Sequence, residues 1–381
     1  MSGGRLTDSQ VADLADELAM AALGESERQA HPMAAVFAGQ PGAGKTHVGA
    51  GVEEALRSRG GCVVVDADLV RPALPYQAGD SNEGQVDAGR VAQELLRRAV
   101  AARRHVVVHG TLRDPDAALK DVQALRGAGY GIEIHALAVN DQISRMRAVH
   151  REQIEADAGL VPRAVPATWH DDAFRGSAAS LRRLEYAAAV DRTVVYNRLG
   201  EAIHDSKPIA GELSASQVFE GARSKLTDYE RVHLAREWDG IIESMERRGE
   251  SAAAIERVRP AADRAHYTMR SSPAAAESFD YLEPASKAGS QASADRYGHL
   301  LATAFRTGDR SQARTMPELA NAFTAEAVAS RMLAQQGPAA PAALQAVRDR
   351  IAMGLQRGAE LAPVQVREAP ARAPQAAAAA R

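Results

Sequence analysis

The residues with the clearest chemical meaning form a glycine-rich stretch in the first eighth of the chain. Its members are Gly39, Gln40, Pro41, Gly42, Ala43, Gly44, Lys45 and Thr46. Glycines in such a loop let backbone N–H groups close around phosphates, and the start of a following helix adds the positive end of its dipole. A lysine placed as Lys45 bridges the β- and γ-phosphates, and a hydroxyl placed as Thr46 binds Mg²⁺. The stretch therefore predicts a phosphate-binding loop (P-loop) that holds a nucleoside triphosphate and magnesium.

Two carboxylates stand two residues apart after an apolar run. Cys62 to Val65 is continuously apolar, and Asp66 and Asp68 follow it. At the edge of a sheet near a triphosphate, one carboxylate can act as general base toward an acceptor hydroxyl. The other can hold the metal or a water. An alternative use of either Asp is to cap a helix or a turn.

Basic residues follow at two further places. Arg113 ends the segment His109-Gly110-Thr111-Leu112-Arg113, where a small Gly-Thr step allows a ligand to approach closely. Four more arginines crowd a segment expected to form a lid, and they are Arg145, Arg147, Arg151 and Arg163. Because phosphoryl transfer needs cations near the migrating group, we expect one or two of these arginines to reach the γ-phosphate.

These residues depend on strands that alternate with helices. Short apolar runs predict strands at 34–38, 62–65, 105–108, 132–139 and 193–196. Helical patterns begin at Thr7 and follow the P-loop to about 59, and others cover about 86–103, 115–126, 141–157 and 167–189. Continuously apolar strands that alternate with helices predict an α/β fold, a parallel sheet with helices on both faces. Sites in such sheets gather at the carboxyl ends of the strands.

After about residue 210 the pattern becomes wholly helical. Helices are predicted near 226–248, 251–268, 289–306, 316–336 and 341–357, and the tail is rich in Ala and Pro. We therefore predict a kinase-like domain over 1–210, an all-helical domain over 211–360 and a disordered tail over 361–381.

Composition narrows the function classes. The 381 residues carry a formal net charge of −3, which gives no attraction to nucleic acid or to an anionic membrane. Cys62 is the only cysteine, so an internal disulfide is excluded and a reducing compartment is favoured. No signal-peptide pattern or apolar run of about 20 residues is present, and we expect a cytoplasmic protein without a membrane partner.

Together these motifs resemble the zeta toxin family, the kinase components of bacterial toxin–antitoxin pairs. The resemblance covers about residues 5–205, in family order. It rests on the segment from Phe37 to Thr46, the run from Val64 to Asp68, Gly110-Thr111 with Arg113, Arg151, the segment Arg163 to Pro166 with His170, and the run Val195 to Arg198.

The resemblance implies a role for each matching residue. The family phosphorylates UDP-N-acetylglucosamine on a sugar hydroxyl with ATP or GTP. By resemblance, Asp68 is the base, Lys45 and Thr46 hold triphosphate and metal, and Thr111 and Arg113 contact substrate beside Asp66. Arg151 and Arg163 resemble the family's γ-phosphate arginines, with Arg147 possible because the spacing differs by one residue. Asn197 and Arg198 resemble the segment near the adenine, and an antitoxin protein is the implied partner.

The sequence departs from the family pattern at two positions on the acceptor side. His109 stands where the family usually has Glu, and Gln93, with Glu94 adjacent, corresponds best to a second family Glu. Each replacement removes a negative charge that could accept a hydrogen bond. They predict that UDP-N-acetylglucosamine is a poor substrate, and that the true acceptor carries more negative charge on this side or contacts it differently.

Two other functions fit the same residues. The first is a kinase of another small molecule, such as an NAD-like nucleotide or an antibiotic. The second is a nucleotide-sensing regulatory protein whose helical half binds a partner, inhibits the core or docks an antitoxin. A GTPase is disfavoured because the five lysines, at 45, 120, 207, 225 and 287, form no Asn-Lys-x-Asp motif.

Overall fold

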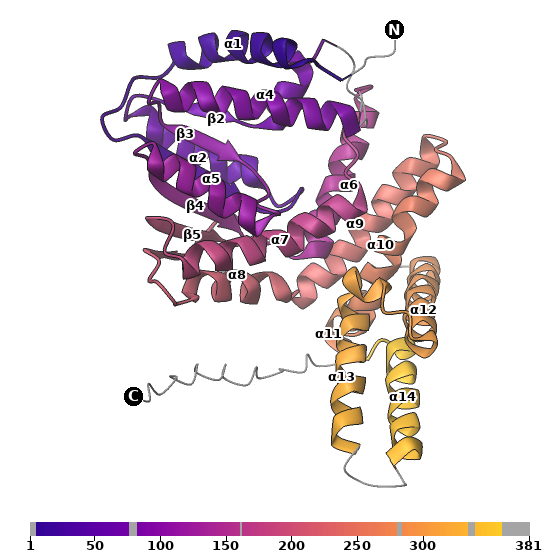
Figure 1. Ribbon diagram of the computed structural model, residues 1–381. Helices are drawn as coiled ribbons and strands as arrows, with labels where there is room; N and C mark the ends of the chain where they lie inside the picture. Colours follow the sequence, from indigo (N-terminus) through magenta and orange to yellow (C-terminus); the bar gives the residue numbers. More distant parts are fainter. Residues whose placement is uncertain (1–4, 76–81, 161, 280–283, 334–339, 360–381) are drawn as a thin grey trace, which may run out of the picture. The chain divides into compact units, whose positions relative to one another are not determined.

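The computed structural model describes residues 5–75, 82–160, 162–279, 284–333 and 340–359. The chain divides into two compact units, Met1–Ala261 and Ala262–Arg381, which are described separately below. The predicted tail over 361–381 lies outside the described residues. Figure 1 colours the chain in sequence order.

The first unit is built on a six-stranded sheet with strand order β2-β3-β1-β4-β5-β6. The strands are β1 (Met33–Ala38), β2 (Val63–Val65), β3 (Val106–His109), β4 (Gly131–Leu137), β5 (Arg192–Tyr196) and β6 (Ala202–Ser206). The first five are mutually parallel, which confirms the predicted fold class. Strand β6 pairs antiparallel with β5 and was not predicted, because its sequence Ala-Ile-His-Asp-Ser lacks a buried apolar pattern.

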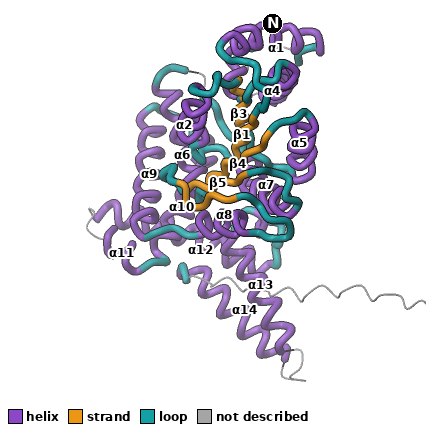
Figure 2. The backbone as a smooth tube through the Cα atoms, turned by 90° about the vertical axis from the view of Figure 1, so that its left-hand side faces the viewer, coloured by secondary structure: helices purple, strands orange, loops and turns teal. Residues whose placement is uncertain are grey.

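Helices cover both faces of this sheet. On one face lie α2 (Lys45–Arg57) and α6 (Asp141–Asp157), which pack on Ala35, Phe37 and Val107. The other face carries α1 (Asp8–Gly24), α4 (Asn82–Ala101), α5 (Pro115–Gly127), α7 (Ala167–Tyr186) and α8 (Ser214–Ser224). Figure 2 shows the strands between α2 and α6 on one side and α5 and α7 on the other. The sheet is therefore covered on both faces, as its apolar strands require.

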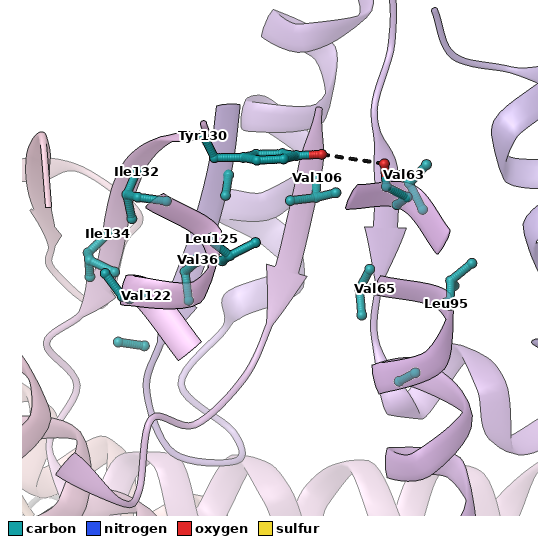
Figure 3. Packing of buried hydrophobic residues seen from close by; sticks show 14 of the residues in the cluster. Val36, Val63, Val65, Leu95, Val106, Val122, Leu125, Tyr130, Ile132 and Ile134 are labelled. Carbon is teal, nitrogen blue, oxygen red and sulfur yellow. Dashed lines mark hydrogen bonds between the residues drawn. The ribbon is translucent and has the colours of Figure 1, made fainter. Parts of the chain in front are cut away.

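The central position of β1 fixes the start of the P-loop. Five of its six residues are buried, and it pairs with β3 on one side and β4 on the other. Val36 packs in the core with Val106 and Ile134 from those neighbours, as Figure 3 shows. The carboxyl end of β1 is thus held by a strand on each side, and the loop that follows begins from a rigid point.

The first unit extends about fifty residues beyond the predicted boundary near 210. Ala215 and Phe219 of α8 belong to the main core, and Phe219 is fully buried. Helix α8 has no side-chain cap of its own, and Glu185 of α7 accepts hydrogen bonds from the N–H groups of Ala215 and Ser216 at 2.6 and 2.9 Å. Helical periodicity alone does not reveal that α8 belongs to the sheet unit.

Further helices complete the first unit. They are α3 (Ala67–Val70), the 3₁₀ turn η1 (Arg71–Ala73) and α9 (Asp228–Arg247). Helix α9 packs on α6 and buries Trp238. Helix α10 (Ala252–Arg270) begins in this unit, and the division falls within it, between Ala261 and Ala262.

The second unit is helical, as predicted. It contains the end of α10, α11 (Pro273–Phe279), α12 (Pro284–Thr307), η2 (Gln312–Arg314), α13 (Pro317–Leu333) and α14 (Ala340–Arg357). Tyr267, Tyr297, Phe305 and Phe323 fill its core, and the Tyr267 hydroxyl donates to Leu355 O at 2.7 Å. Across the described ranges of the whole chain, no helix is long and apolar enough to cross a membrane.

The packing of α8 predicts where the chain can be shortened. A chain of residues 1–261 should fold with a sharp thermal transition. A chain of residues 1–210 lacks Phe219 and leaves the buried Glu185 carboxylate without its donors. Loss of one buried Phe costs about 3–5 kcal/mol, so the unfolding midpoint of the 1–210 chain should lie roughly 10 °C or more below that of the 1–261 chain. Equal midpoints in a thermal melt would show that the core ends near 210.

Candidate active site

A cleft of about 890 Å³ opens at the carboxyl ends of β1, β2 and β3. All of its lining residues lie between 41 and 173, within the first unit. It brings together Pro41, Gly42, Gly44, Lys45, Thr46, Asp66, Asp68, Gln93, His109, Thr111, Arg113, Arg151 and Arg163 from the predicted set. Arg71, Arg90, Arg147 and Trp169 are among the other lining residues. Among the described residues of this lining, Asp66 and Asp68 are the only carboxylates, and the rest is rich in cations.

The P-loop lies hard against α6. Gly42 has a φ of 78°, and a Cβ placed on it would come within 2.0 Å of Ser144 O. Gly44, with a φ of 92°, precedes the first residue of α2. Both positions therefore favour glycine. Gly42 needs it for its backbone conformation and for space, and Gly44 needs it for its backbone conformation alone. The loop leads directly into the start of α2, which is the local arrangement that an anion-binding loop requires.

The second residue of the loop, Gln40, belongs to a buried chain of hydrogen bonds that the sequence did not predict. Gln40 is fully buried, and its Nε2 donates to Val139 O and to Ser144 Oγ, each at 2.9 Å. Ser144 Oγ also lies 2.9 Å from His170 Nε2. The P-loop, α6 and α7 are thus joined by hydrogen bonds, and burial lowers the pKa of His170. The nearest sequence signal was His170 itself, in the family motif.

Lys45 faces the two carboxylates from the start of α2. Its Nζ donates to Gly39 O at 2.7 Å and to Gln40 O at 3.2 Å. Desolvation of the ammonium lowers the pKa of Lys45 to about 8, although the charges of Asp68 and Asp66 oppose the shift. The side chain is thus a cation that can lose its proton just above neutral pH.

Asp66 and Asp68 have different environments. Asp66 Oδ1 accepts the N–H of Asp68 at 2.8 Å and caps α3, which is the alternative use that its sequence position left open. Burial raises the pKa of Asp66, although that hydrogen bond acts in the other direction. Asp68 is 43% exposed, and its Oδ2 lies 3.8 Å from Arg163 Nη1. Asp66 is thus engaged by a helix cap, whereas Asp68 faces an arginine of the cleft lining.

Three of the four arginines in the segment predicted to form a lid line the cleft. Arg147, Arg151 and Arg163 do so, whereas Arg145 forms an ion pair with Asp171 beside the buried chain. Arg163 donates to Glu155 and Arg151 lies 4.0 Å from the same carboxylate. Burial and the nearby charge of Arg198 lower the pKa of Arg147. Glu155 was not predicted as part of the site, and no motif marks it.

The loop after β3 is fastened to α7. A Cβ on Gly176 would come within 1.8 Å of Arg113 O, and Ser180 Oγ donates to Leu112 O at 2.6 Å. Leu112 adopts a φ of 47°, a conformation that non-glycine residues seldom take. The Arg113 guanidinium lies 5.9 Å from the centre of the Trp169 ring. Close packing against Gly176 therefore sets where Thr111 and Arg113 stand.

His109 differs from the placement that its motif suggested. Its ring stacks on Phe37 at 4.9 Å and packs over Gly49, with Nε2 3.6 Å from Glu53 Oε1. Its side chain is 5% exposed, so most of the imidazole is buried under α2 at the cleft wall. Gln93 lines the cleft, whereas Glu94 bonds to Arg98 on the side of α4 that faces α1. The acceptor side thus has no carboxylate from either position.

Asn197 and Arg198 lie outside the lining of this cleft, in the turn between β5 and β6. Asn197 Oδ1 accepts the N–H groups of Leu199 and Glu201 at 2.9 and 3.0 Å. Arg198 forms an ion pair with Glu230 of α9. Gly200 in the same turn packs beside His47 at the start of α2. A role beside the nucleotide base remains a prediction.

The residues present fit a magnesium ion held jointly with phosphates. Thr46, Asp66 and Asp68 offer oxygen ligands at one end of the cleft, and Mg²⁺ commonly takes one or two protein ligands beside phosphate oxygens. Within the described residues, no group of three or more His, Cys, Asp or Glu side chains could hold a metal by itself.

Comparisons with known proteins agree with this architecture. Residues 19–208 match the zeta toxin family. Toxin PezT of Streptococcus pneumoniae serotype 4 is 28% identical over 185 residues, covering 46% of this chain and 72% of PezT. Toxin zeta of Enterococcus hirae is 25% identical over 184 residues, covering 46% of this chain and 64% of that toxin, which is less than two thirds of it.

A solved structure from the PezAT chromosomal toxin–antitoxin system of S. pneumoniae matches with a TM-score of 0.53 at 21% identity. The match covers 63% of this chain and 98% of the other. This likeness shows that the two chains share a fold.

The contact at Gly176 gives a prediction that a matched glycine can control. Gly176→Ala should displace the backbone at Arg113 and lower the unfolding midpoint by several degrees, because the clash is with main chain. Gly221 also lies within a helix but has no atom within 4 Å of an added Cβ. Gly221→Ala should be neutral or stabilise by up to about 1 kcal/mol. Two thermal melts decide this, and equal midpoints would contradict the packing.

Proposed function

We propose that this chain, which belongs to the zeta toxin family through residues 19–208, transfers the γ-phosphate of ATP or GTP to a hydroxyl of a small-molecule acceptor. The observation that carries the proposal is the cleft itself. Lys45 and Thr46 at the P-loop face Asp68, and Arg151 and Arg163 line the same space. Groups that can bind phosphate, a carboxylate that can act as general base and cations for the migrating phosphoryl group therefore line one cleft.

In this reaction the chain's residues position charge and move one proton. The P-loop N–H groups and Lys45 bind the β- and γ-phosphates, and Arg151 and Arg163 neutralise charge on the migrating phosphoryl group. Asp68 takes the proton of the acceptor hydroxyl while the oxygen of that hydroxyl forms its bond to the γ-phosphorus. The bond from that phosphorus to the bridging oxygen breaks, and the nucleoside diphosphate leaves. Thr46 and a nearby carboxylate would hold a magnesium ion, which would supply further neutralisation of the phosphates.

For the acceptor we propose a nucleotide-sugar resembling UDP-N-acetylglucosamine, or another nucleotide that is more anionic. Arg113 beside Trp169 supports an acceptor with phosphate and a planar ring, because guanidinium groups pair with phosphates and aromatic rings stack. Gln93 places an amide rather than a carboxylate in the described lining, which supports tolerance of extra negative charge there. Membership in a toxin family supports an antitoxin protein as partner.

The pKa of Lys45 predicts how nucleotide affinity depends on pH. Triphosphate stabilises the ammonium form, so affinity should be full well below pH 8 and fall as the pH rises through the value of about 8. At pH 9 the dissociation constant for Mg-ATP should be about tenfold weaker than at pH 7. Calorimetry at both pH values measures this. Lys45→Arg, which stays charged, should bind with little pH dependence, and Lys45→Ala should stay folded but lose binding. A wild-type affinity equal at both pH values would contradict this role for Lys45.

A labelled-ATP screen of nucleotide-sugars, nucleotides and antibiotics tests the reaction directly, with the phosphorylated product read by mass spectrometry. Asp68→Asn should bind Mg-ATP normally but transfer phosphate at least ~10²-fold more slowly, because the general base is lost. A wild type that binds ATP but phosphorylates none of these compounds would favour the nucleotide-sensing alternative. Equal loss of ATP binding in Asp68→Asn and Lys45→Ala would make Asp68 a nucleotide or metal ligand.

A further inference from the structure

Glu155, near the end of α6, holds the segment that carries Arg163. Its Oε2 accepts the backbone N–H of Arg163 at 2.7 Å, and its Oε1 accepts Nε and Nη2 of the same residue at 2.8 and 2.5 Å. One carboxylate thus fixes both the main chain and the guanidinium of Arg163. Burial acts to raise the pKa of Glu155, but the bonds from Arg163 outweigh it and keep that pKa below its usual value.

The same carboxylate lies between the two arginines of the proposed γ-phosphate site. Arg151 Nε is 4.0 Å from Glu155 Oε1, the same oxygen that accepts from the Arg163 guanidinium. Both arginines line the cleft, whereas Glu155 does not. Glu155 therefore acts from behind the cations, and any effect on a ligand passes through them.

The neighbourhood of Arg163 offers its guanidinium a second carboxylate. Arg163 Nη1 is 3.8 Å from Asp68 Oδ2, a longer contact than any that Glu155 makes to Arg163. Without the charge of Glu155, Asp68 would be the strongest remaining attraction for Arg163 among the contacts described. The arginine would then close onto the proposed base, leaving neither group free for its task.

We propose that Glu155 is a positioning residue, which presents Arg151 and Arg163 as a pair of cations to the γ-phosphate and keeps Arg163 from closing onto Asp68. This inference rests on the proposed kinase function. The inference predicts that removing the charge of Glu155 weakens ATP binding, whereas simple electrostatics predicts that it strengthens ATP binding. Removal of a negative charge near a binding site should strengthen binding of an anion, whereas loss of positioning should weaken recognition of the γ-phosphate.

The test compares affinities for Mg-ATP and Mg-ADP, measured by calorimetry on the full chain. Their ratio isolates recognition of the γ-phosphate. Glu155→Gln should lower the preference for ATP about tenfold and change ADP affinity by less than about twofold, because charge-assisted hydrogen bonds to Arg163 are lost. An unchanged or increased ATP preference overturns the inference.

The chain offers a closely matched control. Glu152 lies on the same helix, its side chain is 11% exposed like that of Glu155, and it pairs with Arg257 at 2.6 Å, away from the cleft lining. Glu152→Gln should keep the wild-type ATP preference. An equal loss in both variants would mean that any buried ion pair of α6 has this effect, and would overturn the inference.

A double variant separates positioning from a general structural role. Because the hydrogen bonds of Glu155 go to Arg163 and its contact with Arg151 is longer, Glu155→Gln should change the ATP preference clearly less in an Arg163→Ala background than in the wild type. Losses that multiply in the double variant contradict this. Should Glu155→Gln fail to fold, Arg163→Lys carries the test, because lysine cannot take the two-pronged bond and the preference should fall similarly. An Arg163→Lys protein with wild-type preference overturns the inference. A wild type that binds neither nucleotide contradicts the proposed function, and this inference with it.

Discussion

The close approach of the P-loop to α6 is the constraint on which the rest of the site depends. The space for a Cβ at Gly42 is occupied by the carbonyl of Ser144, and Gln40 is hydrogen-bonded to the side chain of that same serine. Because α6 also carries Arg147, Arg151 and Glu155, this contact fixes the distance between the phosphate loop and the cations that face it. A shift of α6 by the width of one methyl group would change the packing of the P-loop and the positions of these cations at once.

The order of the strands explains why distant motifs meet. Strand β1 lies between β3 and β4, and β2 lies beyond β3, so the residues after β1, β2 and β3 share one edge of the sheet. The chain leaves β1 through α2 toward β2 and returns to β3 before crossing to β4. This reversal of direction beside β1 is where doubly wound sheets form their binding crevice. This strand order therefore brings together the P-loop, the Asp66–Asp68 pair and the Thr111–Arg113 step.

The charge distribution of the cleft gives the site its chemical character. Cations outnumber the two carboxylates in the lining, and several of them are partly neutralised from outside it. Glu155 pairs with Arg163, and the negative charge of Glu230 acts on Arg147. These counter-charges lie outside the cleft lining, so they offset part of the repulsion among the cations without adding carboxylates to the cleft.

The sequence by itself determined the local features of this protein. The spacing from Gly39 to Thr46, the apolar strands and the acidic pair after Val65 each depend on residues adjacent in the chain, and such patterns carry their own conformational preference. Only the tertiary structure decided the features that depend on contacts between distant segments. These include Glu155 behind Arg163, Gly176 beneath Arg113, the burial of His109 under α2 and the assignment of α8 to the sheet unit. A buried carboxylate or a helical glycine has no local signature of its partner, because the partner is chosen by how the helices pack on the sheet.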